Sequence, residues 1–413
     1  MEIELNEKNY SICYTAAQAE FDRDTPLGFN WTADRSIADR LGLQGVDKLA
    51  LASVVGDLLV AAETGRAVSY SRNKNFYRGQ QRYCGGAYTY ANVTGCVRAL
   101  EGAGYIENWT APARSPREGV QGVQSRMRAT PLLLEACHGL PVTRPDSRET
   151  IWLRDVDGRN VDYAETRAVD RMRKRVERIN ANILSIEMGL PLPGVTQEAH
   201  HLVIPHVAKT GNAVDIYIPN DALSVRRLFC RGSFQCGGRL YGSWQQIPSA
   251  LRSSVTLNGE PTAEPDFSSI HPRLAYAMAG RPLAPGDDPY TTGDFPRKHG
   301  KLAVLVSLNA PTTTAAVGAI AEELGTPREY ASRLLKAVKA KNPDIAHMLG
   351  TDAGVILQRR DSDIALDVIE ACHRDGIHVL PVHDSFIVPA KHADRTREIM
   401  DRAWSEALIS AAA

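Results

Sequence analysis

The 413-residue sequence lacks the features that place a chain in a membrane or an oxidising compartment. No apolar run reaches the ~18 residues that a membrane-spanning helix needs, and the first residues, MEIELNEKNY, contain no apolar signal-peptide core. The seven cysteines are scattered without a CxxC pair, which is typical of reduced thiols and not of disulfides or zinc sites. We therefore expect a cytoplasmic protein with no membrane partner.

The sequence also lacks an excess of charge of either sign. Lys plus Arg and Asp plus Glu number 48 each, so the net charge neither indicates nor excludes nucleic acid, and local clusters must decide. A hydrophobic content of 43% over this length suits two or three globular domains, each with its own core. Residues 1–44 show too little periodicity to be assigned.

One local cluster is strongly basic. The segment from Arg66 to Arg98 contains six basic residues and no acidic residue, interleaved with aromatic residues. Because basic groups neutralise phosphates and aromatic rings stack on bases, the segment predicts a nucleic-acid surface formed by Arg72, Lys74, Arg78 and Arg98. The alternative is a solvated basic loop with its tyrosines in a core; the interleaved aromatic residues are Tyr70, Phe76, Tyr77, Tyr83, Tyr88 and Tyr90.

The pattern around this cluster predicts a winged-helix-like domain over residues 45–140. Apolar spacing indicates a helix over 46–62, and Thr89 can cap a second helix that ends near Gly102. An extended segment, a wing over 112–124 and a returning strand over 125–134 would follow. Such a domain places one helix near a DNA groove, although winged helices also bind proteins.

Residues 141–200 read as a linker followed by a long helix. Pro141, Pro145 and several acids favour a boundary over 141–160, and 163–188 has a helical pattern with many arginines. Such a charge run is commonly a solvated face. Its place upstream of the motifs below equally suits a helix that grips a nucleic-acid backbone.

Two acids have the sequence context of metal ligands. Asp266 stands where a strand would end, just before a helix start capped by Ser268 or Ser269, and the Phe267 carbonyl could add a second hard oxygen. Asp384 lies between two apolar runs and is therefore expected at a strand end or hairpin turn. Phosphoryl transfer uses two metal ions ~3.5–4 Å apart, which two carboxylates from separate strands can hold.

A cationic helix face lies between these acids in the sequence. Arg297, Lys301, Leu305 and Asn309 are four residues apart and share one face. The face would offer two cations to a triphosphate and two further side chains to the base and sugar.

The order of these segments resembles the motifs of family A polymerases, the DNA polymerase I type. DFSSIHPR at 266–273 is similar to motif A, Arg297-x3-Lys301 to motif B, and Val382-His383-Asp384 to motif C. Gly238-Arg239-Leu240 and Gln246-Ile247-Pro248 are similar to an upstream segment that approaches the primer-template. Gln358, before an expected helix over 363–373, is similar to the glutamine that precedes motif C.

The resemblance implies a role for each matching residue. It assigns Asp266, Phe267 (through its carbonyl) and Asp384 to two Mg2+ ions, or Mn2+, and Arg297 and Lys301 to the incoming triphosphate. Lys301 would also protonate the leaving pyrophosphate. The resemblance places His271, Leu305 and Asn309 at the nucleotide, and it assigns the primer-template to Arg239, Gln246, Arg273, Gln358 and His383.

The resemblance implies an α+β fold, with a right-hand polymerase palm and helical fingers over 201–413, a thumb-like helix within 141–200 and the winged-helix-like domain in front. The partners would be a DNA primer-template and nucleoside triphosphates; the sequence names no protein partner. The chain is too short to include a proofreading exonuclease. Recruitment to a particular DNA element, or self-priming, would suit the arrangement.

Two departures from the family A motifs leave open whether the substrate is a deoxyribonucleotide or a ribonucleotide. His271 replaces the glutamate that excludes ribose in the DNA enzymes, and HDSF at 383–386 is closer to phage single-subunit RNA polymerases. A DNA polymerase is the leading interpretation. A small RNA polymerase or primase is the first alternative, and a DNA-binding replication initiator with a degenerate polymerase-like half is the second.

Overall fold

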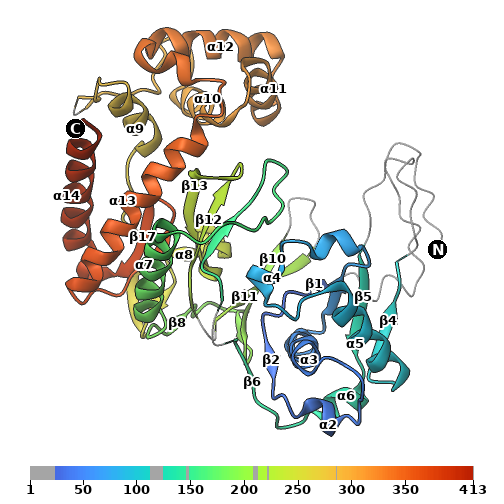
Figure 1. Ribbon diagram of the computed structural model, residues 1–413. Helices are drawn as coiled ribbons and strands as arrows, with labels where there is room; N and C mark the ends of the chain where they lie inside the picture. The colour runs from blue at the N-terminus through green and yellow to red at the C-terminus, as the bar shows by residue number, and fades with distance from the viewer. Residues whose placement is uncertain are drawn as a thin grey trace. The chain divides into compact units, whose positions relative to one another are not determined.

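The computed structural model describes residues 24–111, 124–145, 148–207, 213–220, 223–284 and 286–412. Of the predicted wing, only Gln124 lies within the described residues. The chain divides into two compact units: the first runs to Glu149 and takes in Asn160–Asp162 and Glu198–His200, and the second contains the remainder. Both contain helices and strands, so the fold is of the mixed α and β class (Figure 1). Among the described residues, no helix has both the length and the apolar content that crossing a membrane requires.

The first unit is built on a four-stranded sheet of order β1-β3-β5-β4, in which only the β1–β3 pair is parallel. Its strands and two longest helices are β1 (Asp24–Pro26), α3 (Lys48–Ala62), β3 (Ala67–Tyr70), α5 (Tyr90–Gly102), β4 (Ile106–Trp109) and β5 (Ser125–Ala129). The shorter elements are β2 (Thr32–Ala33), α2 (Ile37–Arg40), η1 (Lys74–Tyr77), α4 (Gln81–Cys84), α6 (Pro131–Ala136) and β6 (Val142–Thr143).

The local signals at the ends of α3 and α5 explain these helices. The Asp47 side chain accepts a hydrogen bond from the first turn of α3, and the Thr89 hydroxyl accepts one from the Asn92 N–H of α5 at 3.2 Å. Both predicted helices are therefore confirmed. The returning strand predicted over 125–134 is wrong beyond Ala129, because Thr130 caps α6 and Pro131 occupies its first turn.

The second unit contains a five-stranded antiparallel sheet of order β16-β17-β15-β14-β8. Its strands are β8 (Met188–Gly189), β14 (Thr256–Leu257), β15 (Glu260–Ala263), β16 (Leu380–Val382) and β17 (Ser385–Pro389). A second sheet contains β7 (Ile151–Leu153), β12 (Arg226–Cys230) and β13 (Ser233–Tyr241), and a third contains β9 (Thr196–Gln197), β10 (His201–Val207) and β11 (Ala213–Pro219). All residues of β16 and β17 are buried, so their hairpin is part of the core.

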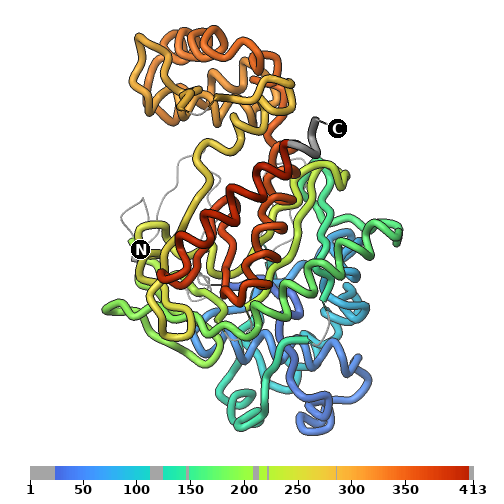
Figure 2. The backbone as a smooth tube through the Cα atoms, turned by 90° about the vertical axis from the view of Figure 1, so that its left-hand side faces the viewer, coloured from blue at the N-terminus to red at the C-terminus, as the bar shows by residue number. Residues whose placement is uncertain are grey.

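Helices complete the second unit. They are α7 (Arg167–Ile183), α8 (Ser249–Arg252), α9 (Ile270–Met278), α10 (Arg297–Asn309), α11 (Thr313–Leu324), α12 (Arg328–Lys341), α13 (Gly354–Arg374) and α14 (Ala393–Ala412). Short 3-10 turns occur at η3 (Ser243–Gln246), η4 (Pro343–Met348) and η5 (Ala390–His392). Helices α10, α11 and α12 pack on one another, and α13 packs against β13, α9 and α14; Figure 2 shows the red α14 in this unit.

Two boundaries within the second unit differ from the sequence prediction. The long arginine-rich helix is α7, which begins after its cap Thr166 and is shorter than the expected 163–188. Gln358 was expected before a helix at 363–373, but it lies in the second turn of α13, which begins at Gly354.

Candidate functional site

Asp384 lies at the tip of a buried hairpin. Val382 of β16 pairs with Ser385 of β17, so only His383 and Asp384 form the turn. His383 has a φ of 61°, the left-handed conformation that a two-residue hairpin turn of this kind requires. The buried strands on both sides fix the position of the Asp384 backbone.

Asp266 is paired to the same hairpin. Its backbone forms an antiparallel bridge with Ser385, the Phe267 N–H donates to the Asp384 carbonyl at 3.1 Å, and the Phe386 N–H donates to the Pro265 carbonyl at 3.0 Å. Helix α9 begins shortly afterwards, at Ile270. Two acids that are far apart in the sequence therefore lie on directly hydrogen-bonded backbone segments.

The expected capping of α9 is only partly correct. Ser269 is the residue before the helix, but it has a left-handed backbone and its side chain makes no capping hydrogen bond.

Both acids line one cavity of about 510 Å3. The cavity also brings together most of the residues that the sequence singled out, namely Arg239, Phe267, His271, Arg297, Lys301, Leu305, Asn309 and Gln358. The predicted face of α10 is correct, because all four of its members lie on this wall. Strand ends thus meet a cationic helix face across a space large enough for a small ligand.

The electrostatics of the cavity favour a cation near Asp384. Burial raises the pKa of the Asp384 carboxyl, and the positive charge of Arg239 offsets that effect only in part. A divalent cation would stabilise the ionised form. Among the residues that the structure describes, no three His, Cys, Asp or Glu side chains gather as a metal site. Two carboxylates nevertheless fit Mg2+, which is commonly held by one or two carboxylates together with water and substrate phosphates.

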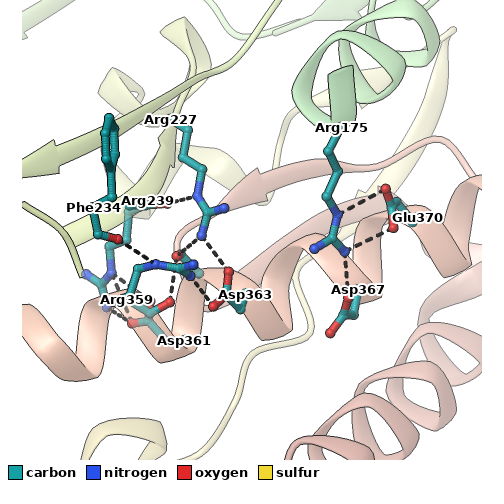
Figure 3. Close-up of polar contacts among 11 residues, drawn as sticks. Arg175, Arg227, Phe234, Arg239, Arg359, Asp361, Asp363, Asp367 and Glu370 are labelled. Carbon is teal, nitrogen blue, oxygen red and sulfur yellow. Dashed lines mark hydrogen bonds and ion pairs between the residues drawn. The ribbon is translucent and has the colours of Figure 1, made fainter. Parts of the chain in front are cut away.

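A buried acid that the sequence reading missed lies beneath this cavity. The Asp361 side chain on α13 is 1% exposed and accepts hydrogen bonds from Arg239, the Nε at 3.0 Å and also the Nη2 (Figure 3). The His271 Nε2 lies 2.8 Å from Asp361 Oδ2 and can donate to it in the tautomer that carries its proton there. Asp361 therefore fixes the orientation of Arg239 and His271.

One sequence signal could have identified Asp361. It occupies the apolar spacing of α13 between Leu357 and Ile364, both of which are buried. An acid at such a position requires a cationic or hydrogen-bonding partner inside the fold.

Further along α13, arginines attach the helix to neighbouring elements. Arg227, 2% exposed, donates to Asp363 at 2.6 Å and to the Gly238 carbonyl at 2.7 Å. A Cβ on Gly238 would lie 2.8 Å from Phe229, so only glycine permits this approach of β13. These contacts hold α13 and β13 rigidly under the cavity.

Helix α7 contributes a similar attachment. Its Arg175 donates to Glu370 at 3.0 and 3.1 Å and to Asp367 at 2.5 Å (Figure 3). The thumb-like role proposed for this helix therefore cannot use Arg175 as a free cation. Arg167, Arg171 and Arg178 remain exposed.

The two cations of α10 have different surroundings. Arg297 forms a two-point ion pair with Asp288, with distances of 2.9 and 3.1 Å, and its guanidinium lies 5.3 Å from the centre of the Tyr290 ring. Lys301 is exposed and makes no ion pair within the described residues. Neither Asp288 nor Tyr290 was singled out from the sequence, although Tyr290 lines the cavity.

Three of the predicted primer-template residues lie outside this cavity. His383 lines an adjoining space of about 570 Å3 together with Glu264 and both catalytic candidates, and burial lowers its imidazole pKa to about 4. Gln246 is exposed on η3. The Arg273 guanidinium lies 4.1 Å from the centre of the Trp404 ring, in a cation–π contact.

The predicted basic surface lies in the first unit. Arg72, Lys74, Arg78 and Arg98 are all exposed. Most of the interleaved aromatic side chains do not join them: Tyr70, Tyr77, Tyr83 and Tyr88 are each at most 3% exposed, whereas Tyr90 is half-buried and Phe76 is exposed. Stacking of these four rings on bases is therefore a wrong prediction, because the rings fill the core while their hydroxyls find internal acceptors, such as the Leu27 carbonyl for Tyr88.

Comparison with known proteins identifies no family for the chain. No family model and no curated protein matches the chain. Among solved structures, the chain is similar to the POL domain of Pol1 from M. smegmatis, solved in complex with DNA primer-template and dNTP, with a TM-score of 0.33 and 14% identity. The match covers 49% of this chain and 46% of the polymerase chain. A likeness this weak does not establish a function, which must be inferred from the residues of the site.

Proposed function

We propose that the chain is a template-directed nucleotidyl transferase of the DNA polymerase type, in which Asp266 and Asp384 bind two divalent cations. One observation carries the proposal: backbone pairing brings these two acids to one cavity, whose other wall includes Arg297 and Lys301. Carboxylates that bind metal ions and cations that bind phosphates are the two elements that phosphoryl transfer requires.

Different residues of the cavity would bind the metal ions and the triphosphate. When bound, Mg2+ or Mn2+ would lower the pKa of the attacking hydroxyl and would offset the negative charge of the leaving pyrophosphate. Asp266 and Asp384 provide carboxylate oxygens, with the Phe267 carbonyl as a further hard ligand. Arg297 and Lys301 bind the triphosphate, and the Lys301 ammonium can give its proton to the leaving pyrophosphate.

The remaining cavity residues would hold the nucleotide and the primer-template. Leu305 and Asn309 face the base and sugar from α10, while Arg239 and Gln358 contact the primer-template from β13 and α13. Asp361 keeps Arg239 in place, so this contact is preorganised. The neutral His383 imidazole is suited to orienting the primer end. Gln246 and Arg273 would contact nucleic acid beyond the reacting pair.

A second candidate, an RNA polymerase or primase, has one specific observation in its favour. His271 is 7% exposed, is held by Asp361 and lines the cavity, so the position that excludes ribose in the DNA enzymes is occupied by an imidazole. Incorporation assays with dNTPs or rNTPs, each with and without a primer, separate the two candidates. Absence of incorporation in all four would refute both, and equal activity in Asp384→Ala would refute the metal assignment.

The first unit is proposed as a winged-helix-like DNA-binding module. Strands β3, β5 and β4 are neighbours in that order, and α5 with its exposed Arg98 directly precedes β4. Neutralising Arg72, Lys74 and Arg78 together should reduce the salt dependence of duplex binding by roughly 0.9 in log–log slope per lost phosphate contact. An unchanged slope would exclude this surface.

A further inference from the structure

The ion pair between Asp288 and Arg297 leaves part of the arginine free. Asp288 takes the Nε and Nη2 edge of the guanidinium, at 2.9 and 3.1 Å. A guanidinium has five N–H donors, so the end formed by Nη1 and the second N–H of Nη2 stays available. The Arg297 side chain is 59% exposed and lines the cavity, which allows this free end to meet a ligand.

The segment that carries Asp288 is itself fixed. The Asp288 carboxylate accepts hydrogen bonds from the Tyr290 N–H at 3.2 Å and from the Thr291 hydroxyl. The fully buried Asn342 donates to the Pro289 carbonyl at 3.0 Å. These hydrogen bonds restrict both the Asp288 carboxylate and the backbone that carries it.

Tyr290 supports the Arg297 guanidinium from one face. Its side chain is buried, and the Arg297 guanidinium lies over its ring, where the π electrons attract a cation. Helix α10 approaches this residue at Gly300, where a Cβ would lie only 2.0 Å from the Tyr290 carbonyl oxygen. The close contact ties the tyrosine to the helix that carries Arg297.

We propose that Asp288 and Tyr290 are positioning residues that hold Arg297 by one edge and one face, so that its free end points at the phosphates of a nucleoside triphosphate. This inference rests on the proposed function. A preorganised guanidinium loses less rotational freedom when it binds phosphate, because its orientation is already restricted. Asp288 therefore assists anion binding although it carries the same charge as the ligand.

The alternative is competition, in which the Asp288 carboxylate occupies the site that phosphate needs. The two mechanisms predict opposite effects of Asp288→Asn. Positioning predicts weaker triphosphate binding, by about five-fold as expected for a well-formed exposed ion pair. Competition predicts tighter binding and would overturn the proposal.

The test is a double-mutant cycle on the binding of a labelled nucleoside triphosphate, measured by equilibrium dialysis with the full chain. Arg297→Ala should weaken binding about 10- to 100-fold, the range for a lost hydrogen bond to a charged group. Asp288→Asn should add nothing further in the Arg297→Ala background, because Asp288 acts through Arg297. Additive effects would contradict the proposal. In turnover assays, KM for the triphosphate should rise in Asp288→Asn while kcat stays nearly unchanged.

The chain offers a matched control outside the cavity. Asp352 holds Arg231 by the same edge of the guanidinium, with Nε at 3.0 Å and Nη2 at 2.8 Å from the Asp352 Oδ2. Asp352→Asn should leave triphosphate binding unchanged, and an equal loss in this variant would show a general charge effect and overturn the proposal. If the unsubstituted chain binds triphosphate but incorporates no nucleotide, the proposed function is refuted. The double-mutant cycle then still tests whether Asp288 positions Arg297, because it measures binding and not turnover.

Tyr290 is tested separately. Tyr290→Phe keeps the ring and should retain affinity, whereas Tyr290→Leu removes the aromatic face and should weaken triphosphate binding several-fold. A folded Tyr290→Leu protein with unchanged affinity would refute the role of the ring.

Discussion

Replacing Asp361 by asparagine tests whether the cavity is built on a buried charge. The Asp361 side chain is 1% exposed, and its carboxylate faces Arg239, whose side chain is 17% exposed. Asparagine keeps the shape and one acceptor oxygen but removes the negative charge, so the Arg239 guanidinium stays in a poorly solvated place without its hydrogen-bonded counterion. Removing one partner of a buried ion pair costs about 3–5 kcal/mol. We expect about 3 kcal/mol lost from the free energy of unfolding, at the low end because an acceptor remains.

The measurement is urea denaturation followed by circular dichroism, with an unchanged dependence on urea and a lower midpoint as the expected result. Asp367→Asn is a matched control on the same helix, since Asp367 is 53% exposed and also pairs with an arginine. That variant should lose less than about 1 kcal/mol, the usual limit for an exposed ion pair. If Asp361→Asn were as stable as the control, the argument that Asp361 organises the cavity would be refuted.

Two further substitutions test other parts of the fold. Gly300→Ala should destabilise the second unit by about 1–3 kcal/mol, the usual cost of overpacking, because its Cβ would collide with the Tyr290 carbonyl; a denaturation midpoint equal to that of the unsubstituted chain would contradict the close approach. Burial raises the pKa of Asp57 to about 6, although the N–H groups of Gly28 and Trp31 donate to its carboxylate. Since the folded form binds the proton more tightly than the unfolded form, the fold loses about 3 kcal/mol of stability as Asp57 ionises between about pH 3 and 7. Relative to the unsubstituted chain, Asp57→Asn should therefore gain about that much over the same pH range in denaturation experiments, and a difference independent of pH would contradict the raised pKa.

Local sequence patterns predicted the parts of the site that depend on near neighbours in the chain. Apolar runs on both sides of Asp384 are enough to predict a hairpin, because such runs are buried as strands. The four-residue spacing from Arg297 to Asn309 predicted the face of α10 because helical geometry fixes which side chains share a face. That Asp266 and Asp384 lie together was not readable from spacing alone; the resemblance to polymerase motifs implied it. The backbone bridge between Asp266 and Ser385 that brings them together is seen only in the structure.

The parts that sequence reasoning missed depend on contacts between distant segments. Asp361 pairs with Arg239, 122 residues away, and no local pattern indicates which arginine meets a buried acid. The tyrosines of the basic segment have the composition of a stacking surface, yet burying a large ring stabilises the fold more than exposing it, and each hydroxyl can find an acceptor inside. Asp288 was missed because it lies outside every recognised motif and contacts Arg297 from a loop.

Binding of Mn2+ shows directly whether Asp266 and Asp384 hold metal ions. Mn2+ should be titrated into the full chain with a non-hydrolysable nucleoside triphosphate present, with bound ions counted by electron paramagnetic resonance. We expect two bound ions in the unsubstituted chain and substantial loss of binding in both Asp266→Asn and Asp384→Asn, with Asp352→Asn unaffected. Undiminished Mn2+ binding in folded Asp266→Asn and Asp384→Asn would show that these carboxylates do not hold the ions, and would refute the proposed metal site.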